Sequence, residues 1–362
     1  MNLQVLPPVP CWRDPRQLKV LGMGTALPGP PVATAALLAR VEERFGVAVA
    51  RRGTTLADRL KIETRHLCRD FAARHEAPRP GHANPDLAAA ALRAALAEAQ
   101  LEVNDLAYLI GHTTSPARLV PPNIAFVADG VGFTGPYMEL RQACTGFANA
   151  LVIAQGLLAV PGATAVAIIG SETGSVYFDP QRAGADTGQL VNLVQMGDGA
   201  AAIVVAPDDA GPGARLAGTF FGQIGLGRQP GFTLATGGSD MPFVVGGTLE
   251  FEHACAAVRI SGPALFEHGA MVARTLGTAI DTVDHVIPHQ ANGRLAALLG
   301  PALGIEPRQV FVNADRLGNT GSAAIWLALA ALRSRLAPGA RVLVLGAEAT
   351  KYMFGGFSYV HG

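Results

Sequence analysis

The chain has 362 residues, enough to bury a large core either in two domains or in one large unit. Lys plus Arg number 28 and Asp plus Glu number 28, so no net basic field predicts binding to nucleic acid or to an anionic membrane. Only 15% of the residues are charged, 49% are hydrophobic and 43 are glycine, a composition that indicates helices packed closely on a sheet.

The cysteines and the first residues predict the compartment. Cys11, Cys68, Cys144 and Cys255 show no C-x-x-C spacing, which favours a reducing compartment and argues against a structural zinc site. The first stretch, MNLQVLPPVPCWRDPRQ, lacks the apolar segment of a secretory signal. No run of about 18 uninterrupted apolar residues is present to span a bilayer. We therefore expect a cytoplasmic globular protein with no membrane span and no metal site.

The N-terminal part begins with a Pro-rich arm, residues 1–17, which we expect on the surface. A strand then leads into a glycine turn. Gly22-x-Gly24 resembles the start of a dinucleotide-binding fingerprint, but the third glycine is misplaced and Pro28 follows. We do not expect a nicotinamide site there.

Helices and strands alternate along the rest of the chain. Residues 34–46 and 85–100 have helical periodicity. From residue 105 onward, short apolar runs that read as strands alternate with helical segments; these runs are LAYLIGH, YMELRQA, TAVAIIGSE and AAIVVAP. Such alternation predicts an α/β protein whose sheet is covered by helices on both faces.

The second half of the chain repeats the first. The strand AVAIIGSET aligns with VLVLGAEAT, which brings Glu172 onto Glu348, and LAYLIGH aligns with HVIPH, which brings His112 onto His289. Repeated element order predicts an internal duplication and a pseudo-two-fold fold. We place the first half at residues 18–210 and the second at 211–362.

The stretch ELRQACTGFANALVIAQGLLAV, residues 139–160, places a cysteine where a strand passes into a helix. Cys144 would lie at the helix N-terminus, where free N–H groups and the positive end of the dipole lower a thiol pKa and stabilise the thiolate. A cysteine in that position is a candidate nucleophile. Free cysteines are also common as small core residues, and this stretch alone leaves both interpretations open.

Two further polar residues follow strands or begin helices in the second half. His289 follows the strand VDHVIP, and Asn319 lies in LGNTGSA at the start of a helix. Each has an ordinary structural explanation, as a hydrogen-bonded corner or as a helix cap. The duplication brings both close to Cys144, and the three together favour a catalytic site.

Five motifs carry a resemblance to a known family. ACTGF, MGDGAAAIVV, HQANGRL, GNTGSA and FGGF are similar to signatures of β-ketoacyl-acyl carrier protein synthase III, within the thiolase superfamily. The likeness runs from about residue 18 to the end. It implies a five-layered αβαβα fold, a homodimer and a catalytic triad of Cys144, His289 and Asn319. It also implies thioesters of coenzyme A or acyl carrier protein as substrates, with no cofactor.

The resemblance assigns a role to each site residue. Cys144 attacks an acyl thioester, and the backbone N–H groups of Cys144 and Gly356 form the oxyanion hole. A malonyl-type thioester then loses carbon dioxide, and His289 and Asn319 donate hydrogen bonds to the enolate that forms. Asparagine suits this role because its amide donates without ionising.

The substrate-binding residues depart in part from the family pattern. Arg59 keeps a family arginine that contacts coenzyme A, but Thr55 stands where a tryptophan is expected. Asn292 and Arg294 belong to the HQAN motif and are further expected contacts. These departures predict altered recognition of coenzyme A, or delivery of the acyl group on a carrier protein.

Two features bear on the acyl group. Met196 stands at a pocket-lining aromatic position, and a flexible methionine is compatible with larger acyl groups. The insert at residues 178–192 is long enough to reshape the acyl tunnel. The leading hypothesis is therefore a decarboxylative ketosynthase of a specialised fatty-acid or polyketide-type pathway. The alternatives are an acyltransferase that forms an ester or amide without condensation, and a non-catalytic subunit of a heterodimer.

Overall fold

The structure is a computed structural model that describes residues 9–69, 78–177, 184–208, 212–241 and 251–362. Ten strands of this part form one mixed sheet: β1 (Cys11–Asp14), β2 (Leu18–Ala26), β5 (Tyr108–His112), β6 (Tyr137–Leu140), β7 (Val166–Thr173), β8 (Asp198–Pro207), β9 (Arg215–Gln223), β12 (His285–Pro288), β13 (Arg341–Glu348) and β14 (Met353–Val360). Four shorter strands form two ribbons: β3 (Val32–Ala33) with β4 (Thr64–Arg65), and β10 (Phe232–Leu234) with β11 (Phe251–His253).

The helices follow the expected alternation with the strands. They are α1 (Thr34–Phe45), α2 (Val47–Leu60), α3 (Asn84–Ala99), α4 (Asn123–Val131), α5 (Gly146–Leu158), α6 (Thr187–Gln195), α7 (Cys255–Thr275), α8 (Leu295–Leu303), α9 (Ala314–Leu317) and α10 (Ala324–Arg333).

The strand order confirms the duplication. The order is β12-β13-β14-β9-β2-β8-β7-β5-β6, and β9 meets β2 through only two residue pairs. Outward from that junction, β2-β8-β7-β5 and β9-β14-β13-β12 show the same pairing directions: antiparallel, antiparallel, parallel. Beside β12, Val310 forms a parallel bridge to Val286 in the place that β6 takes beside β5. The pseudo-two-fold fold is therefore present.

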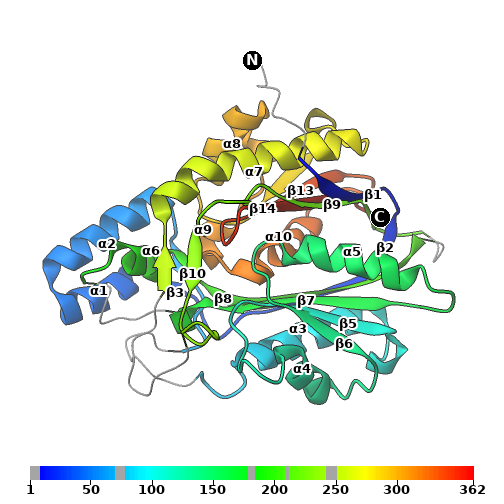
Figure 1. Cartoon of the computed structure of the whole chain (residues 1–362), viewed down its shortest axis with the longest axis horizontal. Helices are drawn as coiled ribbons and strands as arrows, with labels where there is room; N and C mark the ends of the chain where they lie inside the picture. Colours follow the sequence, from blue (N-terminus) through cyan, green and yellow to red (C-terminus); the bar gives the residue numbers. More distant parts are fainter. Residues whose placement is uncertain (1–8, 70–77, 178–183, 209–211, 242–250) are drawn as a thin grey trace.

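The elements form five layers (Figure 1). Helices α7 and α8 lie on the outer face of the half-sheet that contains β13, β14 and β9. A second half-sheet contains β8, β7 and β5, and helices α5 and α10 lie between the two half-sheets. Helices α3 and α4 cover the outer face of this second half-sheet. The predicted αβαβα arrangement is confirmed.

The central layer holds the largest core cluster, which includes the apolar side of α5. A helix enclosed by sheets on both sides has to be apolar almost all round. Phe147, Trp326 and Phe357 pack together there: the Phe147 ring stands edge-on to Trp326 at 5.8 Å and to Phe357 at 5.7 Å. This packing fixes the first turn of α5, directly after Cys144.

The glycines of β2 allow α3 to pack closely on this strand. A Cβ atom on Gly24 would lie 2.1 Å from the carbonyl oxygen of Ala91 in α3. Gly22 meets the same helix one turn further along, where its Cβ would lie 2.3 Å from Ala95 O. The Gly22-x-Gly24 pair therefore serves helix packing.

Replacing Gly24 by alanine is expected to lower the free energy of unfolding by about 1–3 kcal/mol, because the added methyl group meets the α3 backbone, which cannot rotate away. Urea unfolding followed by circular dichroism measures this. Gly156→Ala in α5 is the matched control, since a Cβ there meets no atom within 4 Å and alanine is the better helix former. Equal stability of Gly24→Ala and the unchanged protein would contradict the close contact.

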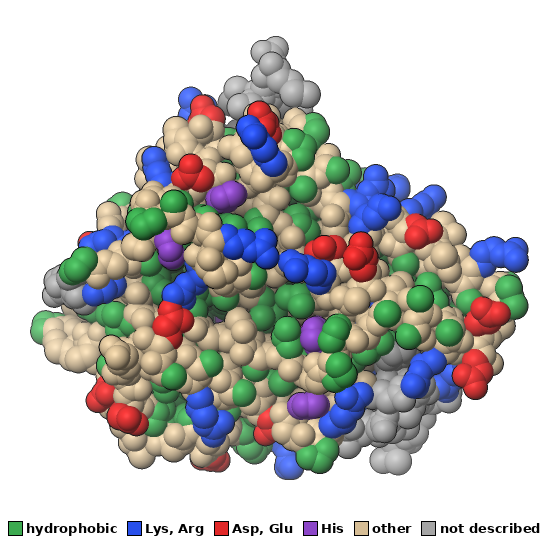
Figure 2. Space-filling view, turned by 180° about the vertical axis from the view of Figure 1, so that it is seen from behind, with side chains coloured by type: hydrophobic (Ala, Val, Ile, Leu, Met, Phe, Trp, Pro, Cys, Tyr) green, Lys and Arg blue, Asp and Glu red, His purple; other side chains and the backbone are tan. Residues whose placement is uncertain are grey.

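The N-terminal arm contributes to the sheet instead of only lying on the surface. Residues Cys11–Asp14 form β1, antiparallel to β9, whereas residues 1–8 lie outside the described residues. The division of the chain at residue 210 stays a prediction. Among the described residues, no helix has both the length and the apolarity to cross a membrane. Figure 2 shows acidic and basic side chains interspersed over one face, in keeping with their equal numbers.

Candidate active site

A cavity of about 150 Å³ lies at the N-terminal end of α5, between the two halves of the chain. It brings together Cys144, His289, Asn319 and Met196, as the sequence predicts. The other lining residues are Thr114, Ala143, Glu172, Asn192, Gln195, Phe232, His253, Val258, Gly262, Leu265, Phe266, Ala291, Gly321, Ala347, Glu348, Ala349 and Thr350.

Cys144 immediately precedes the helix cap. Thr145 is the N-cap residue and α5 begins at Gly146, so the predicted position at a helix N-terminus is confirmed. Cys144 is partly exposed and lines the cavity, whereas Cys68 is fully buried. Cys144 is therefore not among the fully buried core residues, and its role as the nucleophile stays a prediction.

The expected low thiol pKa is also wrong. Burial raises the pKa of Cys144 well above its ordinary value, and the nearby carboxylates of Glu348 and Glu172 raise it further. A thiolate in this position would lose its hydration and face two negative groups, and the helix N-terminus does not offset both effects. Cys144 is therefore a neutral thiol at pH 7.

Glu348 and Glu172 each accept hydrogen bonds from the N-terminus of a helix in the other half of the chain. Glu348, at the end of β13, accepts hydrogen bonds from Thr145 N (2.9 Å) and Thr145 Oγ1 (2.8 Å) before α5. Glu172, in β7, accepts hydrogen bonds from Ser322 N (3.2 Å) and Ser322 Oγ (2.8 Å) before α10. Each half therefore supplies the carboxylate that positions the other half's helix. The repeat in the sequence aligned these glutamates but did not indicate that they line the site.

Because the thiol pKa is raised, acyl loading of Cys144 is expected to accelerate with pH by up to tenfold per unit between about pH 6 and 9. Glu348→Gln keeps an acceptor for Thr145 but removes one negative charge, so its profile should shift toward lower pH. Stopped-flow measurement of thiol release from an acyl thioester gives both profiles. A wild-type rate that levels off below pH 7 would contradict the raised pKa.

His289 directly follows β12 and is held by its own backbone. Its N–H donates to Leu345 O at 2.8 Å, and only 6% of the residue is exposed. Burial lowers the pKa of His289 to about 4, so the ring is neutral at pH 7. Its Nδ1 atom has no hydrogen-bond partner among the described residues. A neutral imidazole has one donor and one acceptor nitrogen and can therefore hydrogen-bond a carbonyl oxygen without adding charge.

Asn319 is oriented by the turn that carries it. Its Oδ1 accepts the N–H of Gly321 at 3.0 Å, and an N–H can only donate, so this contact identifies the amide oxygen. Asn319 N donates to Gln195 O at 2.8 Å, which ties the turn to the end of α6. The Nδ2 donor is therefore left for the cavity. Met196, 7% exposed, lies beside Asn319 through a parallel backbone bridge.

Arg59, Asn292 and Arg294 lie together at the surface and do not line the cavity. Arg294 Nη1 donates to Arg59 O at 3.5 Å, and Arg294 N donates to Asn292 Oδ1 at 2.9 Å. Ala291, which precedes Asn292, lines the cavity, and its carbonyl oxygen accepts a hydrogen bond from Gln195 Nε2 at 2.7 Å. This surface adjoins the cavity wall, and its role in substrate binding stays a prediction.

Gly356 does not reach the cavity lining. It lies in β14, opposite Leu345 of β13 and Phe220 of β9, and a Cβ on it would lie 2.2 Å from Val344 O. Its part in an oxyanion hole stays a prediction, because the sequence motif gives its place in a strand but not the direction of its N–H.

The insert at residues 178–192 lies partly outside the described residues, which resume at residue 184. Its last part forms the first two turns of α6, capped by Asp186, whose Oδ1 accepts the N–H of Gly188 at 2.7 Å. Asn192 from this insert lines the cavity. His253, which also lines it, had no signal in the sequence, since it lies far from every recognised motif.

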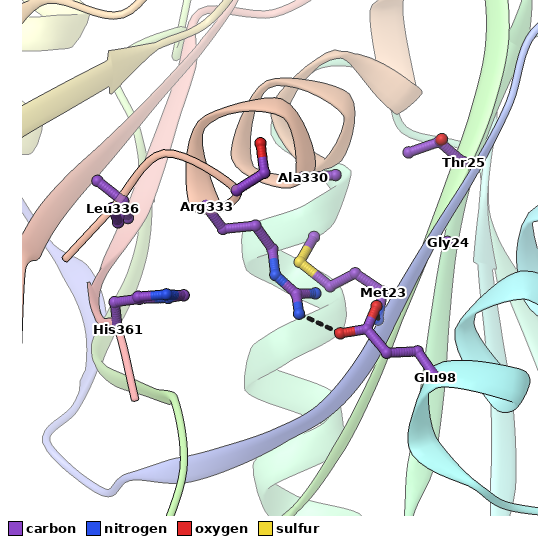
Figure 3. A pocket seen from close by; sticks show the side chains of 9 residues that line it. Met23, Gly24, Thr25, Glu98, Ala330, Arg333, Leu336 and His361 are labelled. Atoms are coloured by element: carbon purple, nitrogen blue, oxygen red, sulfur yellow. Dashed lines mark hydrogen bonds and ion pairs between the residues drawn. The ribbon is translucent and has the colours of Figure 1, made fainter. Parts of the chain in front are cut away.

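A more open depression of about 470 Å³ lies elsewhere, between β2, α3 and the end of α10. Figure 3 shows Arg333 and Glu98 paired across it, with His361 and Met23 nearby. None of its lining residues is a cysteine, so it offers no thiol for acyl transfer. In the part of the chain that the structure describes, no group of three His, Cys, Asp or Glu residues is arranged to hold a metal ion.

Two family models match separate segments of the chain, and curated relatives match most of its length. Residues 138–225 match 3-oxoacyl-[acyl-carrier-protein] synthase III, and residues 273–354 match the C-terminal domain of the same family. A β-ketoacyl-[acyl-carrier-protein] synthase III of Nitratidesulfovibrio vulgaris is 34% identical over 282 residues, covering 73% of this chain and 81% of the relative. One of Rhodospirillum rubrum is 29% identical over 361 residues, covering 96% and 98%.

Solved structures show the same likeness. AbyA1, described as a tetronic acid condensing enzyme, matches with a TM-score of 0.82 and 29% identity, covering 95% of this chain and all of that one. The 3-oxoacyl-(acyl carrier protein) synthase III of Pseudomonas aeruginosa matches with a TM-score of 0.77 and 25% identity, covering 96% and 98%. Together with the cysteine-centred cavity, these matches show that the chain is an acyltransferase and belongs to the β-ketoacyl-acyl carrier protein synthase III family of the thiolase fold.

Proposed function

We propose that the chain transfers an acyl group through an acyl-Cys144 intermediate and condenses it, with decarboxylation, onto a malonyl-type thioester. One observation supports this above all others. Cys144 comes from the first half of the chain and His289 and Asn319 from the second, and all three line one cavity with Asn319 oriented as a donor. A nucleophile and two neutral donors are the groups that such a condensation requires.

The first half-reaction loads the enzyme. Cys144 sulfur attacks the carbonyl carbon of an acyl thioester, a carbon–sulfur bond forms, and the carrier leaves as a thiol that takes the proton. The neutral Cys144 thiol has to lose this proton as it attacks. The N–H of Cys144, at the start of the α5 turn, is a donor for the tetrahedral oxyanion.

The second half-reaction forms the carbon–carbon bond. The thioester carbonyl of the malonyl group accepts hydrogen bonds from His289 and Asn319 Nδ2, and loss of carbon dioxide leaves an enolate on that oxygen. The enolate carbon attacks the acyl-Cys144 carbonyl, a carbon–carbon bond forms, and the carbon–sulfur bond breaks. The Cys144 sulfur leaves as a thiolate and takes up a proton. Both donors are neutral at pH 7, so they stabilise the anion as it develops without binding the malonyl carboxylate as a counter-ion.

The pathway is proposed to be a specialised one, of the fatty-acid or polyketide type. AbyA1, at 29% identity, bears the description of a tetronic acid condensing enzyme, which supports a role beyond acetyl priming. Thr55 is exposed on α2 at the position of the expected tryptophan, and Asn192 and Met196 line the cavity. We further propose that substrates arrive as thioesters of coenzyme A or acyl carrier protein and that the chain acts as a homodimer in the cytoplasm.

Acyl transfer to an alcohol or amine is the second candidate, because loading of Cys144 is common to both reactions. The oriented Asn319 amide favours condensation, since ester or amide formation creates no enolate for it to stabilise. The non-catalytic role would be expected with a lost nucleophile, and Cys144 is present. Acyl-loaded protein offered a malonyl thioester, an alcohol and an amine together discriminates them. A β-keto thioester as the main product supports condensation, and an ester or amide would overturn it.

Acyl chains longer than acetyl are expected to load faster. Each methylene buried in an apolar tunnel contributes about 0.8 kcal/mol, so two or three extra carbons raise kcat/KM by roughly tenfold or more. Intact-mass measurement of the Cys144 adduct with acetyl, hexanoyl and octanoyl thioesters, on coenzyme A and on a carrier protein, gives the order. Preferred loading of acetyl-CoA would contradict this expectation and would indicate an ordinary synthase that initiates chain synthesis with acetyl groups.

A further inference from the structure

The cavity wall contains a polar pair that the proposed reaction does not use. Asn192 lies on α6 and is 1% exposed, and His253 lies at the end of β11. His253 Nδ1 and Asn192 Oδ1 are 3.1 Å apart. The ring of Phe232 stands edge-on to His253 at 5.5 Å, which holds the imidazole in place. Two elements that are distant in the sequence therefore meet to present these two side chains.

Asn192 has an unused donor. Its Oδ1 is occupied by His253, and its Nδ2 has no hydrogen-bond partner among the described residues. Leaving a buried N–H without an acceptor is costly, and nearly all such groups in native proteins find a partner. A buried donor without a protein acceptor, on a residue that lines the substrate cavity, indicates that the acceptor belongs to the ligand.

His253 adds an acceptor beside this donor. Burial lowers the pKa of His253, so the ring is neutral at pH 7. Because Nδ1 donates to Asn192 Oδ1, the remaining nitrogen, Nε2, carries a lone pair. The same cavity is also lined by apolar side chains, Val258, Leu265 and Phe266 among them. A donor and an acceptor side by side in the cavity lining match a ligand group that itself both accepts and donates.

We propose that Asn192 and His253 bind one such group of the thioester substrate, either a hydroxyl or a secondary amide. A hydroxyl could come from the acyl chain, and a secondary amide from the pantetheine arm that both coenzyme A and acyl carrier protein carry. The inference rests on the proposed function only in taking an acyl thioester as the ligand. It makes the pair a specificity determinant that acts on binding and does not take part in bond making.

Binding of unreactive analogues tests this independently of catalysis. In Cys144→Ala protein, calorimetry would measure Kd for two ketone thioethers. In these analogues a ketone replaces the thioester, so the acyl group cannot be transferred. The first has a plain acyl chain on pantetheine, and the second has a hydroxyacyl chain on a butyl group without amides. Asn192→Leu should weaken binding of one probe by roughly tenfold to a hundredfold and leave the other within about twofold. The probe that is affected identifies the source.

His253→Phe keeps the aromatic packing on Phe232 but removes the acceptor, so it should weaken the same probe. Asn104→Leu is the control and should change neither Kd. Asn104 is exposed in the short 3-10 helix Val103–Asp105, donates to Gly132 O and does not line the cavity. Unchanged binding of both probes in Asn192→Leu and His253→Phe overturns the proposal, as does equal weakening of both or no binding by Cys144→Ala protein. Failure of condensation in the unchanged protein would overturn the proposed function without altering these binding results.

Discussion

Replacing His289 or Asn319 by alanine is expected to leave acyl loading of Cys144 within about tenfold of the unchanged rate, while decarboxylation and condensation fall about 10²–10³-fold. In the part of the chain that the structure describes, neither side chain is hydrogen-bonded to the Cys144 thiol. Both line the cavity as neutral donors. Loading is followed by intact mass, and decarboxylation by release of labelled carbon dioxide from a malonyl thioester.

Asn319→Asp provides the sharper variant. One carboxylate oxygen can still accept the Gly321 N–H, so the turn keeps its shape, but the other places a negative charge or an acceptor where Nδ2 donated. Its condensation rate should therefore fall as far as that of Asn319→Ala. If the two alanine variants fold but no longer load Cys144, the assignment of these residues to the second half-reaction is wrong.

Cys144→Ala is expected to abolish loading and condensation completely, the largest effect of any single change. Peptide mapping of the unchanged protein should place the acyl mass on Cys144 and on none of Cys11, Cys68 or Cys255. Cys68 is the most instructive comparison. It is fully buried, and burial together with Asp198 raises the pKa of its thiol, so it has neither access nor a thiolate.

Cys68→Ala is the matched control. The folded Cys68→Ala protein should load an acyl group on Cys144 at the same rate as the unchanged protein. An acyl mass on another cysteine, or the same mass on Cys144→Ala protein, would remove Cys144 as the nucleophile.

The layered fold could be predicted because its evidence is local and repeated. Short apolar strands alternate with helices, and AVAIIGSET and VLVLGAEAT recur at equivalent places, which became β7 and β13. The meeting of Cys144, His289 and Asn319 followed from the same symmetry. A duplicated scaffold superposes equivalent strand ends near its axis, so residues distant in sequence become neighbours.

The electrostatics of the site could not be predicted from these patterns. A helix N-terminus favours a thiolate, but the thiol pKa depends on how many waters remain and on which charges lie within a few ångströms. Both Glu172 and Glu348 are needed to hold helix starts, and that requirement places two carboxylates beside Cys144. Asn192 and His253 were missed for a similar reason, because β11 approaches α6 only in the folded chain.

A pulse and chase on the unchanged protein tests the central claim most directly. The chain is first loaded with an octanoyl thioester and freed of excess reagent, and a labelled malonyl thioester is then added while intact mass and carbon dioxide are followed together. We predict that the acyl mass on Cys144 disappears as an equal amount of carbon dioxide and of β-keto thioester forms. Loss of the acyl mass without carbon dioxide, or an adduct that persists in the presence of the malonyl thioester, would contradict decarboxylative condensation at this site.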